Sequence, residues 1–347
     1  MLIRDVPRQD RWGTILLTSV LVLAVVVCLW EAGLRRAGYR PSLSLQDALW
    51  ARQRNRISDS PPGQTVLLGS SRMQFGFDLD EWARLSGGDR PFMLAWPGGC
   101  PRPVLHDLAE DESFTGTVIC GYTPGLFFAP EEFEFPMRTR KLAKYATRWG
   151  PADRVGQWLR FLVEPRLALL LDSEVALIPF LRERTSLPQR QGQLTPLRYS
   201  ARMASLGEDC RVTIYDSFLT DEAEQKRVTD NWMAASERGA LYELSDDDLE
   251  ALLDQIGRDV DRIRERGGRV VFVRYPSTAW YRETERANHP RDRFWDRLVE
   301  STGCVGVHFE DHPGLSGFDC PEWSHLGRED ATRFTRELFE ILSKQQP

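Results

Sequence analysis

The sequence predicts an α/β domain with a parallel β-sheet, behind one membrane-spanning helix. Helical patterns alternate with short apolar runs, and parallel strands need such crossover connections. Five of the runs are bounded by glycine or proline and are typical of strands buried on both faces. They are 65-TVLLG-69, 91-PFMLAW-96, 117-TVICGY-122, 269-RVVFVRY-275 and 305-VGVHF-309. A separate uncharged run, 14-TILLTSVLVLAVVVCLW-30, comes before them all.

The segment 12–34 is predicted to be a single membrane anchor, with Glu31 as its one charged residue. At about 1.5 Å per residue it can cross a hydrocarbon core of about 30 Å. Trp12 and Trp30 lie near its ends, where interfacial aromatic residues are expected. The alternative is a cleaved signal peptide, but no small-residue cleavage site follows, and the valine before Cys28 is unsuited to a lipid-attachment site.

The charges around the anchor do not decide its orientation. Three arginines precede it and three follow it: Arg4, Arg8, Arg11, Arg35, Arg36 and Arg40. A short amino-terminal tail and a long carboxyl-terminal domain suit a signal anchor that places the domain outside the cytoplasm. We therefore expect a periplasmic domain, with a cytosol-facing one as the alternative.

The composition limits the partners of the chain. Its 347 residues suffice for a sizeable core, and its formal net charge is −6. Beyond residue 40 there are 39 basic and 48 acidic residues, and no basic run interleaved with aromatics. Nucleic acid is therefore not an expected partner, and the domain should not adhere to an anionic membrane by charge alone.

Five cysteines lie beyond the anchor, and their spacing matches no metal site. An odd number leaves at least one of them free or paired between chains. Cys304 and Cys320 could form a disulfide in an extracytoplasmic domain. The alternative is that both are small buried apolar residues.

The remaining sequence divides into a tether and one domain. Local signals mark two helices: Asp78 with Glu81 forms a capping-box pattern, and Ser245 begins a long helix that stops at Gly267. A long interval separates the third and fourth strands, and an excursion of that size is usually a lid, a binding surface or a subdomain. The predicted parts are a tail (1–11), the anchor (12–34), a tether with a short helix near 44–55 (35–62), and an α/β domain (63–347) that includes the excursion (about 124–244), with helices near 132–147, 152–171 and 221–238 and a loop at 184–199.

Two distant stretches carry residues suited to nucleophilic catalysis. Ser70 and Ser71 follow the first strand at Gly69, at the carboxyl edge of the sheet where open α/β folds place ligand sites. His325 comes directly before a carboxyl-terminal helical stripe, with Glu322 three residues upstream. A serine nucleophile needs a base and an acid that orients the base. Asp319 is the alternative acid.

These stretches resemble the SGNH (GDSL-like) hydrolase superfamily, in particular its membrane-anchored branch in cell-surface polysaccharide acylation. Gly69-Ser70-Ser71 resembles the family's G-D-S block, and Glu322-Trp323-Ser324-His325 resembles its D-x-x-H block. The resemblance covers residues 65–342, with the excursion unmatched. It implies a flavodoxin-like α/β/α fold, Ser71 as nucleophile, His325 as base and Glu322 as orienting acid, with neither a metal nor an organic cofactor.

The chain departs from the family pattern in its oxyanion-binding residues. The family's G-x-N-D block supplies an asparagine for this purpose, and the corresponding strand end here, 121-GYTPGLFF-128, has none. The backbone N–H of Ser71 and that of Gly98 or Gly99, in 96-WPGGC-100, are the remaining candidates. Because one lost donor typically costs about a hundredfold to a thousandfold in rate, reduced or altered activity is expected.

Further polar residues near the strand ends are candidate substrate contacts. Arg72 follows Ser71, and Arg274 with Tyr275 ends the fourth strand. The alternative for Arg72 is an ion pair with Asp78 or Glu81.

The expected function is that of a membrane-anchored, extracytoplasmic esterase or O-acyltransferase that hydrolyses or transfers an O-linked acyl group, acetyl in the first place, on a surface polysaccharide. Other membrane components of an acylation or export complex are the expected partners. The alternative is a binding or assembly component of such a complex that has kept the fold and lost the chemistry. The missing asparagine motivates this alternative. A cytosol-facing esterase with a membrane tail is the third interpretation.

Overall fold

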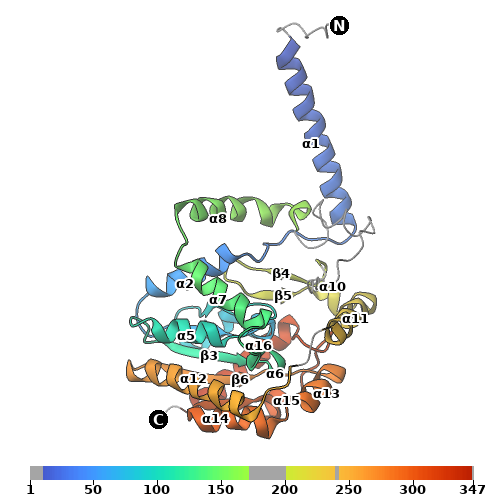
Figure 1. Cartoon of the computed structure of the whole chain (residues 1–347). Helices are drawn as coiled ribbons and strands as arrows, with labels where there is room; N and C mark the ends of the chain where they lie inside the picture. Colours follow the sequence, from blue (N-terminus) through green and yellow to red (C-terminus); the bar gives the residue numbers. More distant parts are fainter. Residues whose placement is uncertain (1–10, 172–200, 239–241, 346–347) are drawn as a thin grey trace, which may run out of the picture.

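The computed structural model describes residues 11–171, 201–238 and 242–345. A long helix, α1 (Trp12–Arg36), projects from an α/β domain (Figure 1). No residue of α1 is buried, and within the described ranges it is the one helix long and apolar enough to span a membrane. It contains the whole predicted anchor. The predicted loop 184–199 and nearly all of the predicted tail lie outside the described residues.

The main sheet has five strands, all parallel, in the order β2-β1-β3-β6-β7. All five correspond to predicted runs. The second is shorter than predicted, since only two residues form a ladder, although the amides of Leu94 and Trp96 still donate to the carbonyls of Leu67 and Gly69. The strands are β1 (Thr65–Leu68), β2 (Phe92–Met93), β3 (Thr117–Tyr122), β6 (Arg269–Arg274) and β7 (Val305–His308).

Successive strand residues point to opposite faces, so each strand contributes to two hydrophobic cores. In β1, Val66 and Leu68 join one core while Leu67 joins the other. The first core is closed by α2 (Asp47–Ser58), α5 (Arg102–Glu110), α7 (Glu134–Ala146), α12 (Asp246–Glu265) and α14 (Arg297–Thr302). The second is closed by α3 (Ser71–Gly76), α4 (Leu79–Ser86), α15 (Pro313–Ser316) and α16 (Arg328–Ser343).

The excursion between β3 and β6 contains a structure that the sequence did not predict, an antiparallel pair of strands. Each strand has only three residues, too few for an alternating pattern to be recognised. The described α-helices and strands of the excursion are α6 (Pro124–Phe127), α7, α8 (Pro151–Val163), β4 (Ala204–Leu206), β5 (Val212–Ile214), α10 (Asp216–Leu219) and α11 (Glu222–Arg238). After β6 come α13 (Ala279–Asn288) and a π-helical turn (Asp292–Asp296).

The helix predicted over 152–171 ends earlier, at Val163. Pro165 cannot donate a backbone hydrogen bond, and its ring excludes the preceding turn of an α-helix. The chain continues instead in two short 3₁₀ turns, η2 (Glu164–Arg166) and η3 (Ala168–Leu170).

The predicted tether is not a free linker along its whole length. Within α2, Trp50 is fully buried, and its indole N–H donates to the carbonyl oxygen of Leu94 at 2.8 Å. Ala51 and Ile57 also belong to the first core. The second half of 35–62 therefore packs as part of the α/β domain.

The disulfide considered for Cys304 and Cys320 is absent, and none of the six cysteines is paired. Both side chains are buried, and Cys320 Sγ lies 3.8 Å from the carbonyl oxygen of Pro276. Burial raises the pKa of both thiols. The alternative interpretation, small buried apolar side chains, describes them.

Candidate active site

Ser71 occupies the first position of α3, directly after the turn that leaves β1. Gly69 has φ +150, and a Cβ there would lie 3.0 Å from Cβ of Met73, so the turn requires glycine. Ser70 is extended and caps α3, accepting from the amide of Arg72 at 3.4 Å. The two serines therefore differ in role: one caps the helix and the other begins it.

A hydrogen-bonded chain joins Ser71, His325 and Glu322. Nε2 of His325 lies 2.8 Å from Oγ of Ser71, across 254 positions of sequence. Nδ1 of the same ring lies 2.8 Å from Oε1 of Glu322. A carboxylate accepts only, so in the neutral ring Nδ1 carries the proton and Nε2 is free to accept from the serine hydroxyl.

Glu322 is fully buried, and both of its carboxylate oxygens accept hydrogen bonds. Besides the imidazole, Oε1 accepts from the backbone N–H of His325 at 2.7 Å. Oε2 accepts from the indole N–H of Trp232, on α11, at 2.7 Å. A buried carboxylate is costly unless its oxygens are hydrogen-bonded, so these contacts hold it facing the histidine. Trp232 carried no signal in the sequence, because its role depends on the folding of the excursion over the sheet.

The loop between Glu322 and His325 has a strained backbone. Trp323 has φ +74, a conformation that costs a bulky residue free energy. Its amide donates to the carbonyl of Cys320, and its carbonyl accepts from the amide of Thr278, both at 2.9 Å. The alternative acid, Asp319, is exposed, and no described contact joins it to His325. Glu322 takes the position beside the imidazole.

The turn that contains Gly98 and Gly99 lies beside the turn that carries Ser71, because the amide of Trp96 donates to the carbonyl of Gly69 at 3.0 Å. The N–H of Gly99 donates to the carbonyl of Trp96 at 2.8 Å, which excludes Gly99 as an oxyanion donor. The amides of Ser71 and Gly98 have no partner among the described residues. They are the two candidates that remain.

Thr123 follows β3 at the edge where the family carries its asparagine. Its hydroxyl lies 2.7 Å from Oγ of Ser70, and both side chains are buried. This hydroxyl pair fixes the position of the capping serine. Thr123 has no distinguishing signal in the sequence, since a threonine after a strand is common.

Arg72 is a buried residue held by interior partners. Its guanidinium pairs with Glu285 at 2.8 Å, donates to Oγ of Ser324 at 3.2 Å and lies 4.9 Å from the ring centroid of Tyr281. The side chain is 3% exposed, which argues against a substrate contact. Arg72 therefore forms an ion pair, as the alternative interpretation expected, but its partner is Glu285 and not Asp78 or Glu81.

Arg274 and Tyr275 are also interior residues. Arg274 pairs with Glu285 at 2.5 Å, and the hydroxyl of Tyr275 lies 3.2 Å from Sδ of Met73. Both are buried, so neither is placed as a substrate contact. Burial alone would raise the pKa of Glu285, but Arg274 and Arg72 outweigh it and hold that pKa below its usual value.

Part of the excursion covers the site. The ring of Phe75, on α3, lies 4.2 Å from the imidazole of His325, and it packs in a small core built by β4, β5, α10 and α11. Trp232 lies 6.1 Å from the same imidazole. Ser71 is 8% exposed and His325 2% exposed, so the hydrogen-bonded chain lies in a nearly closed environment.

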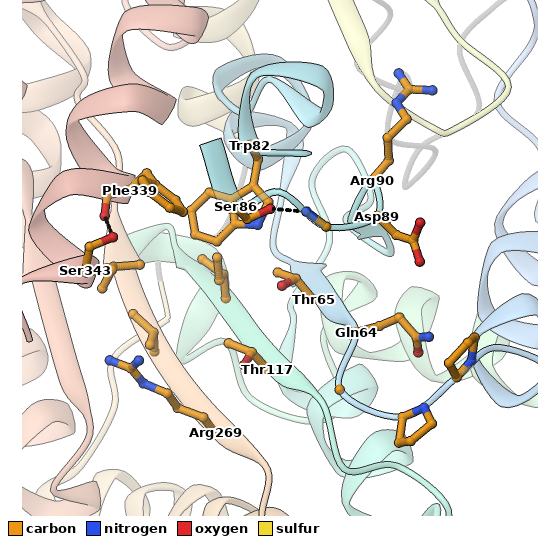
Figure 2. A pocket seen from close by; sticks show the side chains of 17 residues that line it. Gln64, Thr65, Trp82, Ser86, Asp89, Arg90, Thr117, Arg269, Phe339 and Ser343 are labelled. Carbon is orange, nitrogen blue, oxygen red and sulfur yellow. Dashed lines mark hydrogen bonds between the residues drawn. The ribbon is translucent and has the colours of Figure 1, made fainter. Parts of the chain in front are cut away.

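A cavity of about 300 Å³ lies elsewhere, at the opposite edge of the sheet (Figure 2). Thr65, Thr117 and Arg269 line it, and these are the first residues of β1, β3 and β6. Ser71 instead follows the last residue of β1, so the cavity is separate from the serine. Within the described ranges, no group of three or more His, Cys, Asp or Glu side chains is arranged to hold a metal ion.

No protein-family model matches the chain, and no curated protein matches it. The geometry around Ser71 and the resemblance in its two motifs are therefore the basis for a functional proposal.

Proposed function

We propose that the chain is a membrane-anchored SGNH-type enzyme that hydrolyses or transfers an O-linked acyl group, most simply acetyl, on a surface polysaccharide. The observation that carries the proposal is the continuous hydrogen-bonded chain from Ser71 through His325 to Glu322. The strand order supports it too: counted along the main sheet, it is the flavodoxin-like order 2-1-3-4-5. The polysaccharide and the periplasmic location rest on the resemblance and on the single anchor.

In the proposed mechanism, Oγ of Ser71 attacks the acyl carbonyl carbon while Nε2 of His325 takes the hydroxyl proton. Glu322 holds the ring and stabilises its positive charge. The oxyanion is bound by the amides of Ser71 and Gly98. When the tetrahedral intermediate collapses, the C–O bond to the sugar breaks, and His325 returns its proton to the leaving oxygen.

The second half of the reaction regenerates the serine. His325 deprotonates water or an acceptor hydroxyl, which attacks the acyl-serine carbonyl. The bond to Ser71 then breaks, and Oγ recovers a proton from His325. Water as nucleophile gives hydrolysis, whereas a sugar hydroxyl gives transfer.

The proposal is tested by treating the purified full chain with a fluorophosphonate probe and locating the adduct by mass spectrometry. We expect modification at Ser71 and none in a Ser71→Ala variant. Release of acetate from an acetylated oligosaccharide by the same protein would test the substrate class. Probe labelling confined to other residues would overturn the assignment of the nucleophile.

Two observations favour a second function, that of a non-catalytic binding or assembly component. Ser71 is 8% exposed, and Thr123 rather than asparagine follows β3. A folded protein that leaves the probe unreacted and still binds the acetylated polysaccharide would support this alternative.

A further inference from the structure

The helix α8 exposes its apolar residues and buries a polar one. Val155, Trp158, Leu159 and Leu162 follow the spacing of one helical face, and they are 59%, 63%, 47% and 46% exposed. Gln157, on the opposite side, is 4% exposed. A surface helix of a soluble domain normally shows the reverse arrangement. These four residues form the apolar stripe of α8.

The inner side of α8 is attached to the α/β domain. Phe161 packs against the second core, and the guanidinium of Arg52, on α2, lies 4.7 Å from its ring centroid. α8 is therefore held on the domain by one side, and the described part of the chain leaves the apolar stripe uncovered on the other. An exposed apolar surface of this kind marks an interaction site.

The chain that follows α8 is bonded to the end of α1. The carboxylate of Glu31 accepts from the amides of Ala168 and Leu169, both at 3.0 Å. Arg35 donates to the carbonyl of Arg166 at 2.8 Å. The turns η2 and η3 follow α8 directly in the sequence, and their hydrogen bonds attach them to the carboxyl-terminal end of α1.

This attachment places α8 where the membrane surface must lie if α1 spans a bilayer. The uncharged run of α1 ends at Trp30, just before the hydrogen-bonded residue Glu31. Figure 1 shows α8 lying crosswise to α1, across the side of the domain from which α1 projects. A helix along a membrane surface inserts its apolar face at the boundary of headgroups and acyl chains, and tryptophan favours that boundary.

We propose that α8 is an interfacial helix whose apolar stripe inserts into the bilayer that α1 spans. The occupant of the stripe is lipid, because the turns that follow α8 are hydrogen-bonded to α1, the one described helix long and apolar enough to span a membrane. The domain is then held at two points, by a spanning helix and by a surface helix, which restricts its rotation about α1. This inference depends on membrane insertion of α1 and is independent of the serine chemistry.

The test measures the depth of the stripe in the full chain, reconstituted in nanodiscs of phosphatidylethanolamine and phosphatidylglycerol. Cys28, the one exposed cysteine, is first replaced by alanine. A nitroxide is then attached to Leu159→Cys or Leu162→Cys, and its collisions with oxygen and with a water-soluble nickel complex are compared. The control site is Asp261→Cys on α12, whose side chain is 67% exposed.

We expect both stripe sites to collide several-fold more with oxygen than with nickel, relative to the control site. Strong nickel collisions at the stripe would show a water-exposed surface and overturn the proposal. Protection from both reagents would show coverage by protein, which overturns it as well. Dipolar broadening that grows with protein density would then identify a second copy as the cover, and its absence would identify the same chain.

Discussion

The indole N–H of Trp232 donates to Oε2 of Glu322 at 2.7 Å, while Oε1 of the same carboxylate faces the ring of His325 at 2.8 Å. The tryptophan belongs to α11 and the other two residues belong to the carboxyl-terminal loop. The excursion therefore supplies part of the hydrogen-bonded site, besides covering it. A change at Trp232 should therefore alter how Glu322 holds the ring of His325.

Replacing Trp232 by phenylalanine keeps an aromatic ring and removes the donor. Because a hydrogen bond to a charged group is worth about 1.5–3 kcal/mol, we expect the rate of fluorophosphonate labelling at Ser71 to fall by about tenfold or more. The measurement is the labelling rate of the two proteins under one set of conditions. Thermal unfolding checks the fold, and an unchanged rate in a folded variant would show that the bond does not orient His325.

The two adjacent serines should respond differently to alanine. Ser71→Ala removes the proposed nucleophile and should reduce acetyl ester hydrolysis by at least about a thousandfold, with little loss of stability. Ser70→Ala removes the cap and the contact with Thr123, so we expect about 0.5–2 kcal/mol of lost stability and retained labelling at Ser71. The reverse pattern of activities would reassign the nucleophile to Ser70.

The buried cluster of Arg72, Arg274 and Glu285 predicts unequal costs for its members. Glu285→Gln leaves two buried guanidinium groups without their carboxylate and should cost about 3–5 kcal/mol. Arg72→Met leaves a balanced pair of Arg274 and Glu285, so its cost should be smaller, about 1–3 kcal/mol. Urea unfolding of both variants measures the difference. A larger loss for Arg72→Met would mean that the cluster is not held by its carboxylate.

Two glycines offer a matched test of packing. A Cβ on Gly76, the last residue of α3, would lie 2.6 Å from the ring of Tyr275, so Gly76→Ala should destabilise the fold by about 1–3 kcal/mol. Gly257 lies within α12 with no atom near its Cβ position, so Gly257→Ala should stabilise it by about 0.5–1 kcal/mol. Equilibrium unfolding gives both values, and equal effects would contradict the described packing around Tyr275.

The imidazole of His308 should make stability depend on pH. Burial, together with Arg274 and Arg291, lowers its pKa to about 4, and its Nδ1 accepts from the amide of Glu310. In the unfolded chain a histidine has a pKa of about 6.5, so between about pH 6.5 and pH 4 the unfolded state binds a proton that the folded state does not. Stability is therefore full above that window and falls as the pH drops through it, by about 3 kcal/mol in total.

The comparison for this prediction is His308→Asn, whose side-chain oxygen can still accept from the amide of Glu310. Urea unfolding across the window should show a pH slope smaller by about one proton than that of the parent. Any contribution of His289, whose pKa burial also lowers to about 4, is common to both proteins and cancels in the difference. Parallel slopes would show that His308 does not titrate in this way.

Local patterns in the sequence were sufficient to predict the strands of the main sheet and the helix α1. Continuous apolar runs predicted all five strands of the main sheet, and the uncharged stretch predicted α1, because burial on both faces and burial in lipid each demand apolar side chains over a known length. The position of Ser71 at the carboxyl edge of the sheet followed from the end of β1. The proximity of His325 was expected from the two motifs, and the structure describes the hydrogen bond between them.

Only the tertiary structure decided the partners of the polar residues. Arg72 pairs with Glu285 rather than with a neighbour on its own chain segment, Gly99 uses its amide within its own turn, and Trp232 reaches Glu322 from the excursion. The same holds for α8, whose pattern reveals an apolar face but not the side on which the domain packs. Periodicity reports which residues avoid water. Hydrogen bonds and ion pairs instead depend on distances between atoms that folding brings together from far along the chain.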